Sequence, residues 1–173
     1  MTDRRQEFEQ FVAGAADELL RTAYLLVWDL GDAEDLVQEC LIKVAKRWPR
    51  VRRMEHQLAY ARRVLVNLSL DGAERRARGR RELGHDAVIE RPDPVASLHA
   101  DRLDTRAELI AALGALPPRQ RAVLVLRYFL DLPEAEAAAA LGCSVGTVKS
   151  SASRGLTRLE QSLSQPETRS ATR

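Results

Sequence analysis

Side chains that could hydrogen-bond to DNA recur along one stretch near the C-terminus. Ser150, Ser153 and Thr157 follow one another at intervals of three and four residues, so they would share one face of a helix. Lys149 and Arg154 flank them. Hydroxyl groups between two cations suit a helix lying in the major groove, where hydroxyls contact base edges and cations contact phosphates. The pattern therefore predicts recognition of DNA.

The sequence predicts that a helix-turn-helix presents this face. A first helix is expected over 134–141, because Pro133 suits a first helical position. Gly142 is expected to close it in a left-handed conformation, and Ser144 to cap a second helix from Val145. One apolar stripe of that helix is expected to be buried: Val148, Ala152, Leu156, Leu159 and Leu163. A helical hairpin without a ligand is the alternative, but the short turn and the polar face favour DNA binding.

The composition favours an all-α chain with a localised basic surface. Only 5% of the 173 residues are aromatic, so the core must be built from Leu, Val and Ala, which favour helices. The net charge is +2, yet residues 51–81 contain nine arginines and three acidic residues. A basic block in a nearly neutral chain indicates a nucleic-acid surface, with a solvated helix end as the alternative.

Residues that could bind a metal or catalyse a reaction are not grouped along the sequence. Cys40 and Cys143 are far apart and form no CxxC pair, so both are expected to be reduced, buried or partly buried thiols. His56, His85 and His99 lack the spacing of metal ligands. Glycine-rich phosphate loops, nucleophile elbows and HExxH motifs do not occur. We therefore expect no metal, no cofactor, no small-molecule substrate and no enzymatic activity.

Nothing in the sequence predicts export or insertion into a membrane. The N-terminal MTDRRQEFEQF is charged and then amphipathic, unlike a signal peptide. No apolar run reaches the roughly 18 residues of a membrane-spanning helix. Two reduced cysteines are also typical of the cytoplasm, where we expect the protein to reside.

Helical periodicity predicts two small helical domains joined by a flexible linker. The expected parts are a first domain over 1–76, a linker over 77–101, a second domain over 102–163 and a disordered tail over 164–173. Apolar residues recur every three to four positions in five segments before the helix-turn-helix: 8–28, 33–48, 57–76, 102–113 and 119–130. Asp32 is expected to cap the second of these.

Two helices of the first domain carry polar residues away from their buried sides. In the second helix these residues are Asp35, Gln38 and Glu39, and they face either solvent or a partner. In the third helix Tyr60, Arg63 and Asn67 share a stripe. An aromatic ring, a cation and an amide together could bind unstacked bases and phosphates. Alternatively, Tyr60 belongs to the core and Asn67 bonds locally.

Three segments together resemble a known protein family. They read GDAEDLVQECLIKVAKRW, AYARRVLVNLSLDGAERR and LPPRQRAVLVLRYFLDLPEAEAAAALGCSVGTVKSSASRGLTRL. In order and spacing they are similar to bacterial RNA polymerase sigma factors of the sigma-70 class, in the short extracytoplasmic-function (ECF) type that keeps conserved regions 2 and 4. The likeness covers residues 8–163, and SSASRG after VK resembles a sigma-E-like subgroup.

The resemblance implies a sigma factor that binds core RNA polymerase, directs it to promoters through their −35 and −10 elements, and assists duplex opening. Residues 1–76 would be region 2, and residues 102–163 would be region 4. The face that docks on the polymerase would comprise Asp35, Gln38 and Glu39. The −10 surface would comprise Tyr60, Arg62, Arg63, Asn67, Arg75 and Arg76, with Asn67 helping to hold a flipped-out base. The −35 surface would comprise Thr147, Lys149, Ser150, Ser153 and Arg154.

The implied partners are the β′ clamp helices and β flap of core polymerase, promoter DNA and an anti-sigma protein. The residues alone leave two other functions open. A stand-alone helix-turn-helix regulator would bind duplex DNA without polymerase, usually as a dimer on a palindrome. An interaction module would bind another protein without depending on DNA.

Overall fold

The computed structural model describes residues 4–82 and 100–164, and every regular element within them is helical. This confirms the all-α prediction. The elements are α1 (Arg4–Val27), α2 (Leu30–Lys46), α3 (Trp48–Val51), α4 (Gln57–Glu82), α5 (Ala100–Ala115), α6 (Pro118–Leu124), the π-helical turn η1 (Val125–Phe129), α7 (Glu134–Leu141) and α8 (Val145–Ser164).

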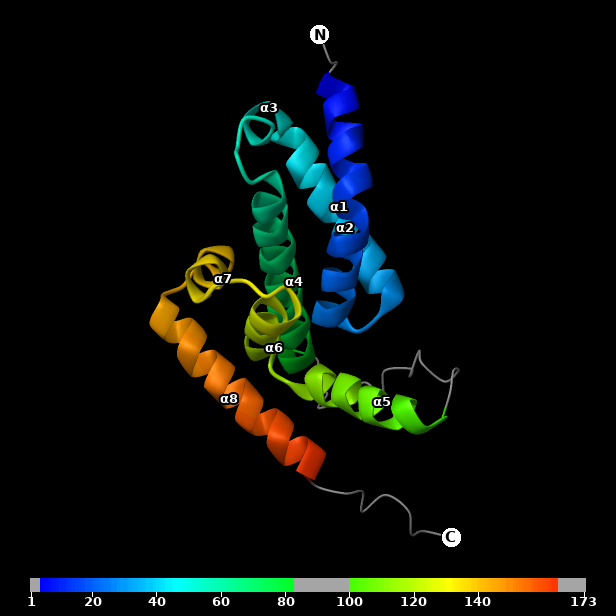
Figure 1. The fold of residues 1–173 in the computed structure, drawn as a ribbon, viewed down its shortest axis with the longest axis vertical. Helices are drawn as coiled ribbons and strands as arrows, with labels where there is room; N and C mark the ends of the chain where they lie inside the picture. The colour runs from blue at the N-terminus through cyan, green and yellow to red at the C-terminus, as the bar shows by residue number, and fades with distance from the viewer. Residues whose placement is uncertain (1–3, 83–99, 165–173) are drawn as a thin grey trace.

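The first domain is a bundle in which α1, α2 and α4 pack against one another (Figure 1). Leu19, Cys40 and Leu65 come one from each helix and are fully shielded from solvent. At one end of the bundle, Trp48 of α3 packs edge-on against Phe8, with ring centroids 5.2 Å apart. The apolar stripes of the three helices therefore meet in a single core, as their periodicity predicted.

The cap of α2 differs from the prediction. The Asp29 side chain, not that of Asp32, forms the cap: its Oδ1 accepts a hydrogen bond from the Asp32 N–H at 2.8 Å. Trp28 precedes it with a φ of 62°, a left-handed conformation that turns the chain at the end of α1. Because this turn is so short, α2 begins at Leu30. Residues 30–32, which fall between two expected helices, therefore lie inside α2.

The second domain comprises α5 to α8. The expected helix over 119–130 forms as α6 followed by η1, in which the Leu130 N–H bonds to the Val125 carbonyl at 3.0 Å. Two exposed aromatic side chains, Tyr128 and Phe129, lie on this π-helical turn. Pro133 then precedes α7 at its N-cap, one position earlier than predicted.

The predicted helix-turn-helix is present as α7 and α8. Gly142 ends α7 with a φ of 61° and a ψ of 38°, the left-handed closure that favours glycine. Ser144 caps α8, since its Oγ accepts a hydrogen bond from the Thr147 N–H at 3.1 Å. Ala138 and Val148 are buried where the two helices meet.

The buried stripe of α8 departs from the prediction at two positions. Val148, Ala152 and Leu159 are buried as expected, but Leu156 is 38% exposed and Leu163 is 44% exposed. Gly155 lies on the buried side and faces α6, where an added Cβ would come within 3.1 Å of Leu124 Cδ1. The packing surface of α8 therefore runs through a glycine, which hydrophobic periodicity does not detect.

The two domains pack against each other and share one continuous cluster of buried residues. Helix α7 lies against α4, and α5, α6 and η1 contact α1 (Figure 1). Helix α4 continues to Glu82, past residue 77, where the linker was predicted to begin. Most of the predicted linker, and the tail from residue 165, lie outside the described residues.

Candidate nucleic-acid interface

The side chains predicted to read DNA from α8 all lie on its exposed face. They are Thr147, Lys149, Ser150, Ser153 and Arg154. The opposite face is held against the rest of the domain by fully buried Val148. Because one side of α8 is fixed by packing, the other side is presented as a rigid polar surface.

Local hydrogen bonds fix the hydroxyl groups of this surface. Ser150 Oγ donates to the Thr147 carbonyl at 3.1 Å, and Thr157 Oγ1 donates to the Ser153 carbonyl at 3.0 Å. In these bonds the hydroxyl hydrogen is used, but the oxygen keeps its capacity to accept. Such oxygens could accept hydrogen bonds from the amino groups of bases in the major groove.

Lys149 is paired with a residue that the sequence reasoning missed. Its Nζ lies 3.5 Å from Glu134 Oε2, at the start of α7. The two side chains are 63% and 37% exposed, so the pair is weak and yields readily to another anion. Glu134 stands in the first turn of α7, where a carboxylate favours the positive end of the helix. The acidic first turn of α7 is the one sequence feature that could have pointed to Glu134 as a partner.

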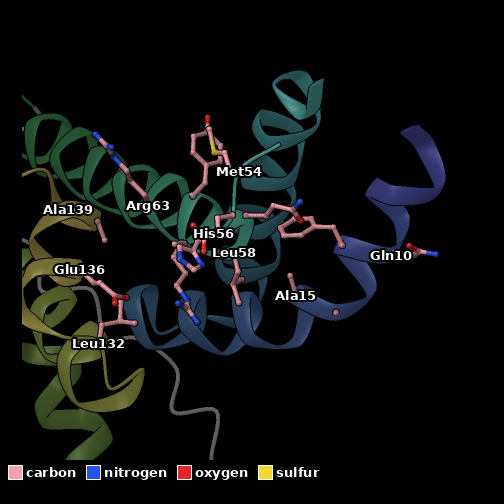
Figure 2. Close-up of a pocket in the computed structure, with 17 residues that line it drawn as sticks. Gln10, Ala15, Met54, His56, Leu58, Arg63, Leu132, Glu136 and Ala139 are labelled. Atoms are coloured by element: carbon pink, nitrogen blue, oxygen red, sulfur yellow. The ribbon is translucent and has the colours of Figure 1, made fainter. Parts of the chain in front are cut away.

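Three of the predicted −10 residues line a common cavity beside α4. Tyr60, Arg62 and Arg63 border an open hollow of about 1030 Å³ (Figure 2). Met54 and His56, from the turn between α3 and α4, also line it. This turn is short and has no periodic pattern, so nothing in the sequence marks it as part of a site. A hollow beside cations and an aromatic ring can accept an unstacked base and its phosphate.

Two of these cavity residues are held by partners within the first domain. Arg62 forms an ion pair with Glu18 of α1, with Arg62 Nη2 2.7 Å from Glu18 Oε1. The Tyr60 hydroxyl accepts a hydrogen bond from Arg47 Nη1 at 3.1 Å. That bond raises the pKa of Arg47 above its usual range. Arg63 is exposed beside them, and it forms no ion pair with another residue that the structure describes.

The remaining predicted −10 residues lie elsewhere on α4. Asn67 is exposed but does not border the cavity. Arg75 and Arg76 border a separate hollow, together with Asp35 and Glu39 of α2. The structure therefore divides the predicted −10 set and brings two of its arginines beside the predicted polymerase face.

The polymerase face itself is open to solvent. Asp35, Gln38 and Glu39 are all exposed on α2. Glu39 forms an exposed i,i+4 pair with Lys43 at 3.4 Å, which fixes it only weakly. An exposed acidic and amide surface on a well-packed helix is available to a basic partner.

Neither a metal site nor a membrane-spanning helix occurs in the described residues. Cys40 is buried, and desolvation raises the pKa of its thiol from the ordinary 9.0 to about 12. Cys143 is half-buried, and both thiols are free, as predicted. A buried, protonated thiol is chemically inert, so Cys40 belongs to the core and not to a reactive site.

Comparison with known protein families matches both domains. Residues 11–80 match the family described as Sigma-70 region 2, and residues 106–159 match the family described as Sigma-70, region 4. The RNA polymerase sigma-E factor of Streptomyces coelicolor is 41% identical over 158 residues, covering 91% of this chain and 86% of that protein. The ECF RNA polymerase sigma factor SigE of Mycolicibacterium smegmatis is 36% identical over 168 residues, covering 95% of this chain and 64% of that protein.

Two solved structures share the fold. The sigma factor RpoE of Bartonella quintana, in complex with the anti-sigma factor NepR, aligns with a TM-score of 0.70 and 25% identity over 94% of this chain and 99% of that chain. CnrH, in complex with the cytosolic domain of CnrY, aligns with a TM-score of 0.62 and 24% identity over 93% of this chain and 89% of that chain.

Proposed function

Because this chain belongs to the sigma-70 family of RNA polymerase sigma factors, in the ECF group, we propose how its surfaces share promoter recognition. As a sigma factor, it binds core RNA polymerase and directs it to specific promoters. We assign region 2 to residues 1–76 and region 4 to residues 102–163. The family implies a non-enzymatic role, so in our proposal the polymerase carries out all of the chemistry.

We assign recognition of the −35 element to α8. Its exposed hydroxyl groups, on Ser150 and Ser153, would contact base edges in the major groove. Lys149 and Arg154 would contact phosphates and so fix the register of the helix on the duplex. Thr147, at the N-terminus of α8, would contact a phosphate or base where the helix dipole is positive.

We assign the −10 element to α4 and the adjacent cavity. Opening a duplex costs a few kcal/mol per unstacked base step, and pocketing an extruded base offsets part of that cost. In this proposal Tyr60 stacks on a base, Arg62 and Arg63 contact the strand, and Asn67 helps to hold a flipped-out base. Arg75 and Arg76 extend the basic surface along the strand. The cations Arg62 and Arg63 that line the cavity support the assignment.

We assign docking on the β′ clamp helices to Asp35, Gln38 and Glu39, and docking on the β flap to region 4. Polymerase would hold the two reading surfaces at a fixed separation, so that the second DNA contact becomes effectively intramolecular. Neither surface then needs to bind tightly alone. Since polymerase and chromosomal DNA are its partners, we place the protein in the cytoplasm.

We further propose that an anti-sigma protein regulates this chain. The solved RpoE structure is a complex with the anti-sigma factor NepR, and it covers nearly all of this chain. A stand-alone helix-turn-helix regulator is disfavoured, because both family regions are present in order. The observation that carries the proposed function is that both family regions match this chain, one in each domain. Each domain also has an exposed polar surface suited to DNA.

Run-off transcription would test the proposal. Purified core polymerase is incubated with genomic fragments from the source organism, with and without this protein. Transcripts that appear only with the protein, and that start at a common distance from two shared elements, are expected. No stimulation, together with a gel shift of a palindromic duplex by the protein alone, would instead indicate a stand-alone regulator.

A further inference from the structure

Arg47 does not border the cavity beside α4, yet it contacts a residue that does. Its Nη1 donates a hydrogen bond of 3.1 Å to the hydroxyl of Tyr60, and this bond connects the end of α2 to α4. Tyr60 is half-buried and lines the cavity. The two residues are 13 positions apart and lie on different elements, so no local pattern relates them. Arg47 can therefore act on the cavity through Tyr60.

The backbone of Arg47 is fixed at the corner where α2 meets α3. Its N–H donates to the Val44 carbonyl at 3.0 Å, and its carbonyl accepts from the N–H groups of Arg50 and Val51 at 2.9 and 3.0 Å. The next residue, Trp48, is 5% exposed. None of these contacts involves the side chain of Arg47. The guanidinium therefore extends from a rigid backbone, and it can be replaced without disturbing the corner.

The hydrogen bond constrains the Tyr60 ring without using the hydrogen of its hydroxyl group. A phenolic oxygen can accept one hydrogen bond and donate another at the same time. Because this oxygen accepts from Arg47, its hydrogen is left for an acceptor on a ligand. The carbonyl oxygens of bases and the oxygens of phosphates are such acceptors. A tyrosine held in this way offers a ring face for stacking and a hydroxyl group as a donor.

A direct contact with a phosphate is the alternative role for Arg47. Its side chain is exposed, and it forms no ion pair with another residue in the described part of the chain. Lys46, one position earlier, is exposed as well and carries the same charge. The printed hydrogen bond to Tyr60 is the feature that distinguishes Arg47 from this neighbour. Lys46 is therefore the matched control for an effect of charge alone.

We propose that Arg47 is a positioning residue, whose hydrogen bond holds the Tyr60 ring in the orientation that stacks on an extruded base. The same bond leaves the Tyr60 hydroxyl hydrogen available to that base or its phosphate. The effect on DNA rests on the −10 function proposed for α4. The positioning itself is a property of the free protein, so the two parts are tested separately.

Fluorine NMR of the full-length protein tests the positioning. All three tyrosines are replaced by 3-fluorotyrosine, and Tyr60→Phe identifies the Tyr60 signal. Arg47→Met is expected to shift and sharpen this signal, because the ring is released, whereas Lys46→Met is expected to leave it unchanged. Parental signals from Tyr24 and Tyr128 establish that each variant is folded. A Tyr60 signal that responds to both variants equally, or to neither, would overturn the positioning.

A double-mutant cycle tests the consequence for DNA binding. Holoenzyme is bound to a promoter fragment with a single-stranded −10 element, taken from the run-off experiment. Arg47→Met is expected to weaken binding about fivefold, the effect of losing one hydrogen bond. In the Tyr60→Phe background the same change is expected to have no effect, because the bond is already absent. A further fivefold loss in that background would mean that Arg47 acts on DNA directly, contrary to the proposal.

Salt dependence distinguishes positioning from a phosphate contact. Loss of one contact to a single strand makes log K fall less steeply with log salt, by about 0.7 in slope. Arg47→Met is expected to weaken binding with the slope unchanged, and a slope reduced by that amount would refute the proposal. Tyr60→Ala, which removes the ring, is expected to weaken binding more than Tyr60→Phe. Full binding by Tyr60→Ala would refute the −10 function, while the fluorine result would still stand.

Discussion

At the scale of single residues, Lys149 is the cation whose contribution to DNA binding is easiest to isolate. Its pair with Glu134 is exposed and weak, so the ammonium is available to a phosphate. We expect Lys149→Gln to weaken binding of the holoenzyme to a −35 duplex and to make log K fall less steeply with log salt, by about 0.9 in slope. Affinity measured from 50 to 300 mM salt provides the test.

Two further variants distinguish a direct contact of Lys149 with DNA from a general effect of the protein's net charge. Glu134→Gln releases Lys149 and is expected to strengthen binding slightly at low salt. Lys46→Gln removes a cation at the far end of α2 and is expected to leave the salt slope unchanged. Equal effects of Lys149→Gln and Lys46→Gln would mean that Lys149 does not contact the DNA backbone.

Cys40 supplies a prediction about reactivity. Because burial raises its pKa to about 12, the thiol stays protonated at pH 8 and is a poor nucleophile. We expect Ellman's reagent to titrate half-buried Cys143 in the native protein and Cys40 only after denaturation. Two thiols reacting at one rate in the native state would show that the α2–α4 core opens readily.

The same thiol makes stability depend on pH at the alkaline end. The folded pKa is raised, so the protonated form is favoured in the native state. The contribution is fully present below the ordinary value of 9.0 and is lost as pH rises toward 12. Cys40→Ala is expected to flatten this part of the profile in urea denaturation.

Exposed polar residues could be predicted from the sequence, but ion pairs between helices could not. Ser150 and Ser153 follow from helical spacing alone, and both are exposed on α8. Arg62 was assigned to the −10 surface, although Glu18, far away in the sequence, forms an ion pair with it. Pairing between helices depends on tertiary packing, and local patterns carry no information about it.

At the scale of elements, helix interiors were easier to predict than their ends. Gly142 and Ser144 predicted the turn of the helix-turn-helix correctly, because left-handed closure and side-chain capping are local requirements. The start of α2 was predicted three residues late, since Asp29 and Asp32 are both good caps. The left-handed Trp28 decides between them, and no pattern predicts that conformation for tryptophan.

The packing of α8 on α6 gives a prediction for Gly155. An added Cβ would come within 3.1 Å of Leu124, so a larger side chain must push α8 away from α6. We expect Gly155→Leu to lower the free energy of unfolding by about 1–3 kcal/mol, the usual cost of overpacking, despite the better helix propensity of leucine. Gly79→Leu, with open space around it, is the control in the same urea titration. A stabilised Gly155→Leu protein would contradict the observed fit.

At the scale of the whole molecule, periodicity predicted two helical domains but not their contact. Arg121 lies in the helical segment expected over 119–130, where periodicity assigns it no partner, yet it donates to the Leu26 carbonyl across the interface. The helical segment expected over 102–113 ends before Gly114, yet Gly114 belongs to α5 and lies against Trp28. Both residues act through neighbours that are distant in the sequence, so only the folded chain reveals their role.

The separation of the two reading surfaces gives the last prediction. If polymerase fixes region 2 and region 4 at one distance, the −35 contact contributes only when its element lies at the matching distance and on the matching face of the duplex. Inserting about five base pairs, half a helical turn, between the two elements rotates the −35 site to the opposite face. We expect run-off transcription to fall to the level of a template without a −35 element, while the same insertion upstream of that element has no effect. Transcription that tolerates the inner insertion would mean that the domains remain free to move in the holoenzyme, and that the −35 contact is not made effectively intramolecular by polymerase.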